Sequence, residues 1–98
     1  MPRVIITENA ALGLERCRHF LAEKDISATR RAGQIIEKKF TQLETKPESG
    51  KPIENHTQLR ELVISFGNTG YVALYHHSLA TDSVIILAFR HQREVGYN

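Results

Sequence analysis

The chain has 98 residues, of which 41% are hydrophobic and 24% charged, and its formal net charge is +2. These values are ordinary for a small globular protein, so we expect residues 1–98 to form a single domain around one core. No apolar run approaches the roughly 18 residues of a membrane-spanning helix, and no signal peptide opens the chain. We therefore expect no membrane partner.

Cysteine and histidine usage narrows the possible compartment and chemistry. Cys17 is the single cysteine, so it cannot form an internal disulfide, and a cytoplasmic location is the simplest expectation. His76 and His77 are adjacent, which in a strand sends their side chains to opposite faces. No spacing resembles a zinc site, so we expect no metal and no cofactor. A net charge of +2 favours a mildly basic soluble protein over a nucleic-acid-binding one.

The first half of the chain is predicted to be helical. Residues 3–7 contain a β-branched run, which indicates an edge strand or an extended lead-in. Helices are predicted over 8–23 and 27–45, with Ser27 as the cap of the second. Each has an apolar face: Ala10, Leu14, Cys17 and Leu21 in the first, and Ala28, Ala32, Ile35, Ile36, Phe40 and Leu43 in the second. The short polar break between them predicts an antiparallel helix hairpin.

The second half is predicted to be a sheet. Two prolines and a glycine in 46–52 end the helix, and 53–58 is interpreted as a polar connection. Three strands with turns at 67–70 and 78–83 follow: 59–66, 71–77 and 84–90. The last is nearly continuously apolar, which predicts the central, most buried strand. The fold class is therefore α+β, an N-terminal antiparallel helix hairpin packed on a twisted antiparallel sheet of three to four strands.

The segment after the last predicted strand has the chain's densest set of binding-prone side chains. They are two arginines, a histidine and a tyrosine: Arg90, His91, Arg93 and Tyr97. Such groups can hold a phosphate, stack on a base, move a proton or form an interface hot spot. The alternative is a solvated strand end whose arginines pair with Glu94 and Glu61. The sequence leaves both interpretations open.

The order of these features resembles that of a known family. The relevant features are the helix hairpin, the break at 46–52, Leu59-Arg60-Glu61-Leu62, Gly70-Tyr71-Val72-Ala73-Leu74-Tyr75, and residues 84–97 with Arg90-His91-Gln92-Arg93-Glu94. Together they resemble the RelE/ParE superfamily of toxins from bacterial type II toxin–antitoxin modules, over nearly the whole chain. The resemblance implies a toxin that forms a hetero-oligomer with a cognate antitoxin, whose C-terminal segment wraps the domain.

Members of this superfamily differ in their target. RelE-like members cut messenger RNA in the ribosome and resemble one another in basic residues along the strand before the Gly-Tyr turn and in an arginine directly after it. Here Val63 and Ser65 occupy that strand, and Val72 follows Gly70-Tyr71. ParE-like members lack the basic set too and poison DNA gyrase. The resemblance therefore favours a ParE-like toxin acting on DNA gyrase, with a RelE-like ribosome-dependent mRNA interferase as the alternative.

The resemblance also implies site residues. The expected target-binding residues are Arg60, Arg90, His91, Arg93 and Tyr97. Under the mRNA interferase alternative, Arg90, His91, Arg93 and Tyr97 would be catalytic, acting on messenger RNA in the ribosome. The basic residues typical of RelE-like members are only partly present, which favours a toxin without enzymatic activity over an enzyme. A third possibility, from another class, is a non-toxic module that binds a protein through the sheet or the helix hairpin.

Overall fold

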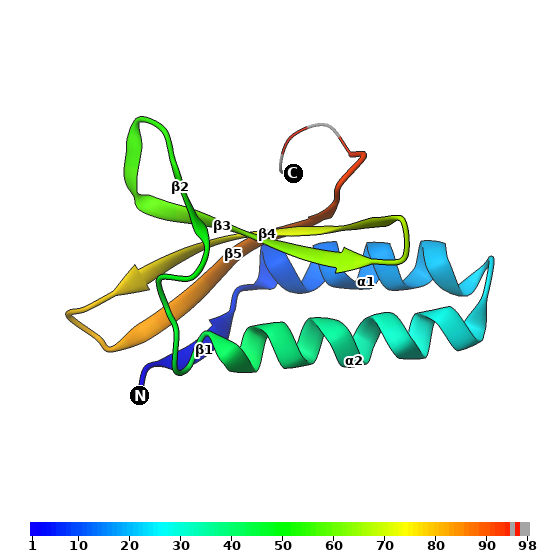
Figure 1. The fold of residues 1–98 in the computed structure, drawn as a ribbon, viewed down its shortest axis with the longest axis horizontal. Coiled ribbons are helices and arrows are strands. Elements are labelled where there is room, and N and C mark those ends of the chain that lie inside the picture. Colours follow the sequence, from blue (N-terminus) through cyan, green and yellow to red (C-terminus); the bar gives the residue numbers. More distant parts are fainter. Residues whose placement is uncertain (95, 97–98) are drawn as a thin grey trace.

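In the part of the chain that the structure describes, two helices lie on one face of a five-stranded sheet (Figure 1). The structure is a computed structural model that describes residues 1–94 and Gly96, apart from the side chain of Thr57. The elements are β1 (Arg3–Ile6), α1 (Glu8–Ala22), α2 (Ile26–Gln42), β2 (Lys51–Ile53), β3 (His56–Phe66), β4 (Thr69–Ser78) and β5 (Ser83–His91). Within this described part, no helix is long and apolar enough to cross a membrane. The predicted α+β class is confirmed.

The sheet is larger than predicted and is mixed. Its strand order is β1-β5-β4-β3-β2, with β1 parallel to β5 and every other pair antiparallel. The predicted central position of the last strand is wrong, because β4 lies in the middle and β5 lies between β4 and β1. The apolar run of β5 instead reflects the burial of most of its residues, since β5 has a neighbouring strand on each edge and helices over one face. The edge strand predicted near residue 3 is confirmed as β1.

The predicted polar connection at 53–58 is also wrong. Lys51–Ile53 pairs with β3 as a short hairpin strand, and the chain turns at Asn55, which takes a positive φ of 68°. The tyrosine hydroxyl of Tyr75 accepts a hydrogen bond from the Gly50 amide at 2.8 Å, so the core itself anchors the start of this strand. A three-residue strand containing Pro52 has no alternation that could have revealed it.

The turn between β3 and β4 is shorter than the predicted 67–70. Phe66 pairs with Thr69, so Gly67 and Asn68 alone form the turn, and Gly67 has a φ of +61°. A positive φ at the first position of a two-residue turn suits the twist of a hairpin. The third and fourth residues of the predicted turn therefore belong to β4.

Both helices begin at a side-chain cap. The Thr7 hydroxyl accepts from the Ala10 amide at 3.2 Å and donates to the Ile86 carbonyl at 2.7 Å, so one side chain starts α1 and fixes it to β5. The predicted cap Ser27 is wrong. Asp25 has an extended backbone, and its carboxylate accepts from the Ala28 amide at 3.0 Å. Aspartate and serine cap equally well, so sequence alone did not distinguish the two positions.

A β-bulge in β5 decides which side chains reach the helices. Leu74 pairs with Ala88 and Tyr75 with Ile86, which leaves Leu87 as the extra residue. Its carbonyl accepts from the Asn9 side-chain amide at 3.0 Å. Because the bulge reverses the alternation, the odd-numbered residues Phe89 and His91 face the helices beyond it, and Arg90 lies on the opposite face.

Helix α1 packs directly on the backbone of β5. A Cβ atom added to Gly13 would lie 2.2 Å from the Phe89 carbonyl oxygen, so no larger residue fits without moving the helix. The Phe89 ring stacks on Tyr71, with ring centroids 5.4 Å apart, and meets Phe40 of α2 edge-on at 6.2 Å. Gly13 therefore sets the spacing between the helix layer and the sheet.

Two helix glycines offer a matched test of this packing. We expect Gly13→Ala to lower the free energy of unfolding by about 1–3 kcal/mol, because the added methyl group overlaps Phe89. A Cβ at Gly33 would meet nothing within 4 Å, so we expect Gly33→Ala to raise that free energy by about 0.5–1 kcal/mol. Chemical denaturation of both variants measures this. Equal effects of the two substitutions would contradict the packing argument.

Candidate functional site

The structure brings three of the predicted site residues together at the end of β5. Arg90 pairs with Val72 and His91 with Tyr71, and Arg93 follows in the adjoining turn. We term residues 90–94 the terminal turn. Tyr97 lies outside the described residues.

Arg60 lies apart from this group. It pairs with Tyr75 in the other half of the sheet, and its guanidinium donates to the carbonyls of Glu48 at 3.0 Å and Gly50 at 2.8 Å. An ion pair to the Glu48 carboxylate at 3.5 Å adds to these contacts. The side chain thus stabilises the loop between α2 and β2, and its predicted role in target binding stays a prediction.

Arg90 stabilises the terminal turn through hydrogen bonds to its backbone. One guanidinium nitrogen donates to three carbonyl oxygens of the turn, those of His91 at 3.2 Å, Gln92 at 3.2 Å and Glu94 at 2.8 Å. A charged donor strengthens each of these bonds, and together they wrap the backbone around the guanidinium. The arginine that the sequence suggested as a target contact is therefore also a structural centre of the site.

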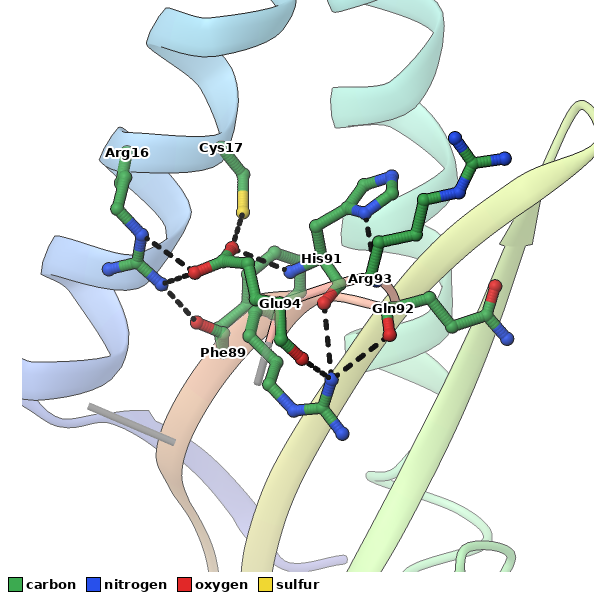
Figure 2. Close-up of polar contacts among 8 residues, drawn as sticks. Arg16, Cys17, Phe89, His91, Gln92, Arg93 and Glu94 are labelled. Atoms are coloured by element: carbon green, nitrogen blue, oxygen red, sulfur yellow. Dashed lines mark hydrogen bonds and ion pairs between the residues drawn. The ribbon is translucent and has the colours of Figure 1, made fainter. Parts of the chain in front are cut away.

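Glu94 ties the terminal turn to α1 (Figure 2). Its carboxylate accepts from the His91 amide at 3.0 Å and forms an ion pair with Arg16 at 2.9 Å. The Cys17 sulfur lies 3.7 Å from the same carboxylate. Arg16 also donates to the Phe89 carbonyl at 3.4 Å, so it holds both the strand and the turn. The sequence suggested Glu94 as a partner for the nearby arginines, and the ion pair instead comes from the first helix.

These contacts change the protonation behaviour of two groups. Burial raises the pKa of the Cys17 thiol to about 11, and the neighbouring Glu94 carboxylate adds to this rise. The thiol is therefore protonated at neutral pH and is a poor nucleophile. Partial burial would raise the pKa of Glu94, but the His91 amide and the Arg16 charge more than offset it, and the pKa is lowered from 4.5.

The two ring nitrogens of His91 have partners inside the protein. Nδ1 accepts from the Arg93 amide at 3.1 Å, so in the neutral ring the proton lies on Nε2, which is 3.0 Å from the Thr69 hydroxyl. The ring also meets Tyr71 edge-on, with centroids 5.5 Å apart. A general base needs a free acceptor nitrogen, and here Nδ1 would first have to release the backbone of the turn.

Arg93 is the exposed cation of the terminal turn. Figure 2 shows its side chain extending away from Glu94, on the opposite side from Arg16. Among the described residues, no cluster of His, Cys, Asp or Glu could hold a metal ion. The arrangement is thus a rigidly held backbone turn that displays one arginine beside a hydrogen-bonded histidine, which is suited to binding.

The ionised Glu94 predicts a pH dependence of this turn. Because its folded pKa lies below 4.5, the carboxylate contributes stability that is present above that pH and is lost as the pH falls through the folded pKa. We expect the His91 amide resonance to titrate with Glu94 below pH 4.5. Glu94→Gln should abolish this titration, whereas Glu23→Gln, at the exposed end of α1, should leave it intact. A titration that survives Glu94→Gln would contradict the assignment.

Comparison with known proteins identifies the family. A family model described as "ParE toxin of type II toxin-antitoxin system, parDE" matches residues 4–96. A search of curated proteins finds no match. The matched region includes the helix hairpin, every strand of the sheet and the terminal turn. The chain belongs to the ParE family of toxins of type II toxin–antitoxin systems.

Proposed function

We propose that this toxin inhibits DNA gyrase in the cytoplasm and that a cognate antitoxin neutralises it. The single observation that carries this choice over mRNA cleavage is the row of residues across the sheet at Arg90. Cross-strand pairing aligns Val63, Val72 and Arg90 in β3, β4 and β5. RNA cleavage requires groups that stabilise the phosphate and transfer protons, and two valines supply neither.

The environment of the terminal turn supports a binding role. Val63 in this row is 49% exposed, so an apolar side chain lies on the same face of the sheet as Arg90. Arginine next to apolar surface is typical of protein–protein hot spots. The turn is also held by internal contacts of Arg90 and Glu94, which limits the entropy lost when a partner binds.

An antitoxin site is supported at a second surface, between the two helices. A groove of about 700 Å³ runs between α1 and α2. Its apolar lining includes Leu14, Leu21 and Ile36, and its charged lining consists of three carboxylates and one cation: Glu15, Glu37, Glu44 and Arg18. This chemistry suits an amphipathic helix with basic residues beside its apolar face.

The edge of the sheet beside the groove supports strand pairing by the same partner. Val4 and Ile6 of β1 line the groove, and Ile5 and Ile6 are exposed. The edge of β1 can therefore accept an added strand. The other edge strand, β2, is short and contains Pro52, both features that discourage pairing.

Gyrase inhibition can be tested with the purified chain in a DNA supercoiling assay. We expect inhibition, and we expect Arg93→Ala to weaken gyrase binding by on the order of 2 kcal/mol if Arg93 is a hot spot. Its effect on the free energy of unfolding should be below about 0.5 kcal/mol, since the side chain is exposed. Arg30→Ala, an exposed arginine of α2, is the matched control and should leave inhibition unchanged.

Two outcomes would contradict gyrase inhibition, and a third would exclude the terminal turn as the contact. New messenger RNA ends at ribosomal A-site codons after induction would indicate the mRNA interferase. Growth unaffected by expression without an antitoxin would indicate a non-toxic binding module. Full gyrase inhibition by a folded Arg93→Ala variant would exclude the terminal turn as the contact, even if gyrase were the target.

The antitoxin site has its own test. Gly33 lines the groove with open space around its Cβ position, so Gly33→Leu should fill the groove without disturbing the core. We expect this variant to bind the neighbouring gene's small protein at least about tenfold more weakly, through steric exclusion. Arg30→Leu, outside the groove on the same helix, should bind normally. Unchanged binding by both variants would rule out the groove.

A further inference from the structure

A second cavity, of about 610 Å³, lies between α1, the β3–β4 turn and the terminal turn. Its size falls within the range of small-molecule sites. The cavity shares Cys17, Leu21 and Tyr71 with the interhelical groove and Arg93 with the proposed gyrase contact, and neither assignment accounts for its other lining residues. It therefore merits its own chemical interpretation.

The charge of the cavity favours an anion. Among the residues that the structure describes, three cations and one carboxylate line it: Arg16, Lys24, Arg93 and Glu94. Arg16 and Glu94 neutralise each other through their ion pair at 2.9 Å. Lys24 in the turn after α1 and Arg93 in the terminal turn then contribute two positive charges from different walls. Two cations held on separate elements match a doubly charged group such as a phosphate monoester.

The aromatic lining favours a flat ring next to that anion. Phe20 is 60% exposed, although it is a large apolar side chain, and Lys24 Nζ lies 4.9 Å from its ring centroid. Phe66 is partly exposed and provides a second ring, and the neighbouring Tyr71, with its centroid 6.5 Å away, is 4% exposed. An exposed ring at a cavity mouth can stack on any flat heterocycle without sequence or substituent requirements.

Asn68 in the β3–β4 turn and Thr69 at the start of β4 have polar groups that can form hydrogen bonds with the edge of such a ring. Asn68 has a side-chain amide that both donates and accepts hydrogen bonds. The Thr69 hydroxyl accepts from the neutral His91 ring at 3.0 Å, which leaves its own hydrogen available to a ligand. The cavity thus combines two positive charges that match a phosphate dianion, an aromatic stacking surface, and hydrogen-bond donors and acceptors.

We propose that this cavity binds a nucleoside monophosphate. The phosphate lies between Lys24 and Arg93, and the base stacks on Phe20 with its edge towards Asn68 and Thr69. The proposal does not depend on gyrase as the target. Because Arg93 serves both sites, the nucleotide and a protein bound at the terminal turn would compete.

Calorimetric titration of the purified chain with AMP, GMP, CMP and UMP tests the proposal. We expect saturable binding of at least one of them, and binding of inorganic phosphate and of the free nucleoside that is at least about tenfold weaker. Phe20→Ala and Arg93→Ala should each weaken binding about tenfold. The matched controls are Leu12→Ala, which is 61% exposed on the same helix, and Arg30→Ala, and both should bind normally.

The results that would overturn the proposal are distinct from those that test gyrase inhibition. Absence of saturable binding by all four nucleotides would overturn it. Equal affinity for inorganic phosphate would also overturn it, because the site would then recognise an anion without a ring. Equal losses in Phe20→Ala and Leu12→Ala, with both variants melting like the parent chain, would place the nucleotide elsewhere. Supercoiling assays without added nucleoside monophosphate test gyrase inhibition separately.

Discussion

The contact of α1 with β5 is the constraint on which the rest of this structure depends. Thr7 begins the helix and bonds to Ile86, Gly13 allows the helix to touch the Phe89 carbonyl, and Arg16 reaches the same carbonyl one turn later. These three contacts lie in sequence order along β5 and along α1 from its N-terminal cap. They bring Arg16 and Cys17 to the end of β5, where Glu94 returns to meet them. Backbone packing thus determines where the terminal turn lies.

The bulge at Leu87 determines which faces of the sheet Arg90 and His91 occupy. It directs His91 towards the helices and Arg90 to the other face of the sheet, so two neighbouring residues have different tasks. Arg90 organises the backbone of the turn through its carbonyls, and His91 accepts the Arg93 amide. Arg93 is then displayed on a backbone fixed from both faces. A preorganised turn of this kind loses little conformational entropy on binding a partner.

Local patterns predicted most of the fold and only part of the site. Helical spacing found both helices, alternation found β3, and the glycine-asparagine pair marked its turn, since these signals depend on neighbours in sequence. The short β2 strand, which contains Pro52, has too few residues to show alternation, and the parallel pairing of β1 depends on a distant partner, β5. Arg90, His91, Arg93 and Tyr97 were predicted as site residues because binding-prone side chains are concentrated there in the sequence. The link of Glu94 to Arg16 spans the whole domain, so no spacing rule could reveal it.

The central claim is that a turn held by Arg90 and Glu94 forms the toxin's target-binding surface. Hydrogen–deuterium exchange of the chain, free and bound to purified gyrase, tests this claim most directly. The account predicts slower amide exchange on binding at the described residues 90–94, with exchange in β1 and along the interhelical groove unchanged. Protection confined to β1 and the groove, with the terminal turn exchanging as in the free protein, would contradict it.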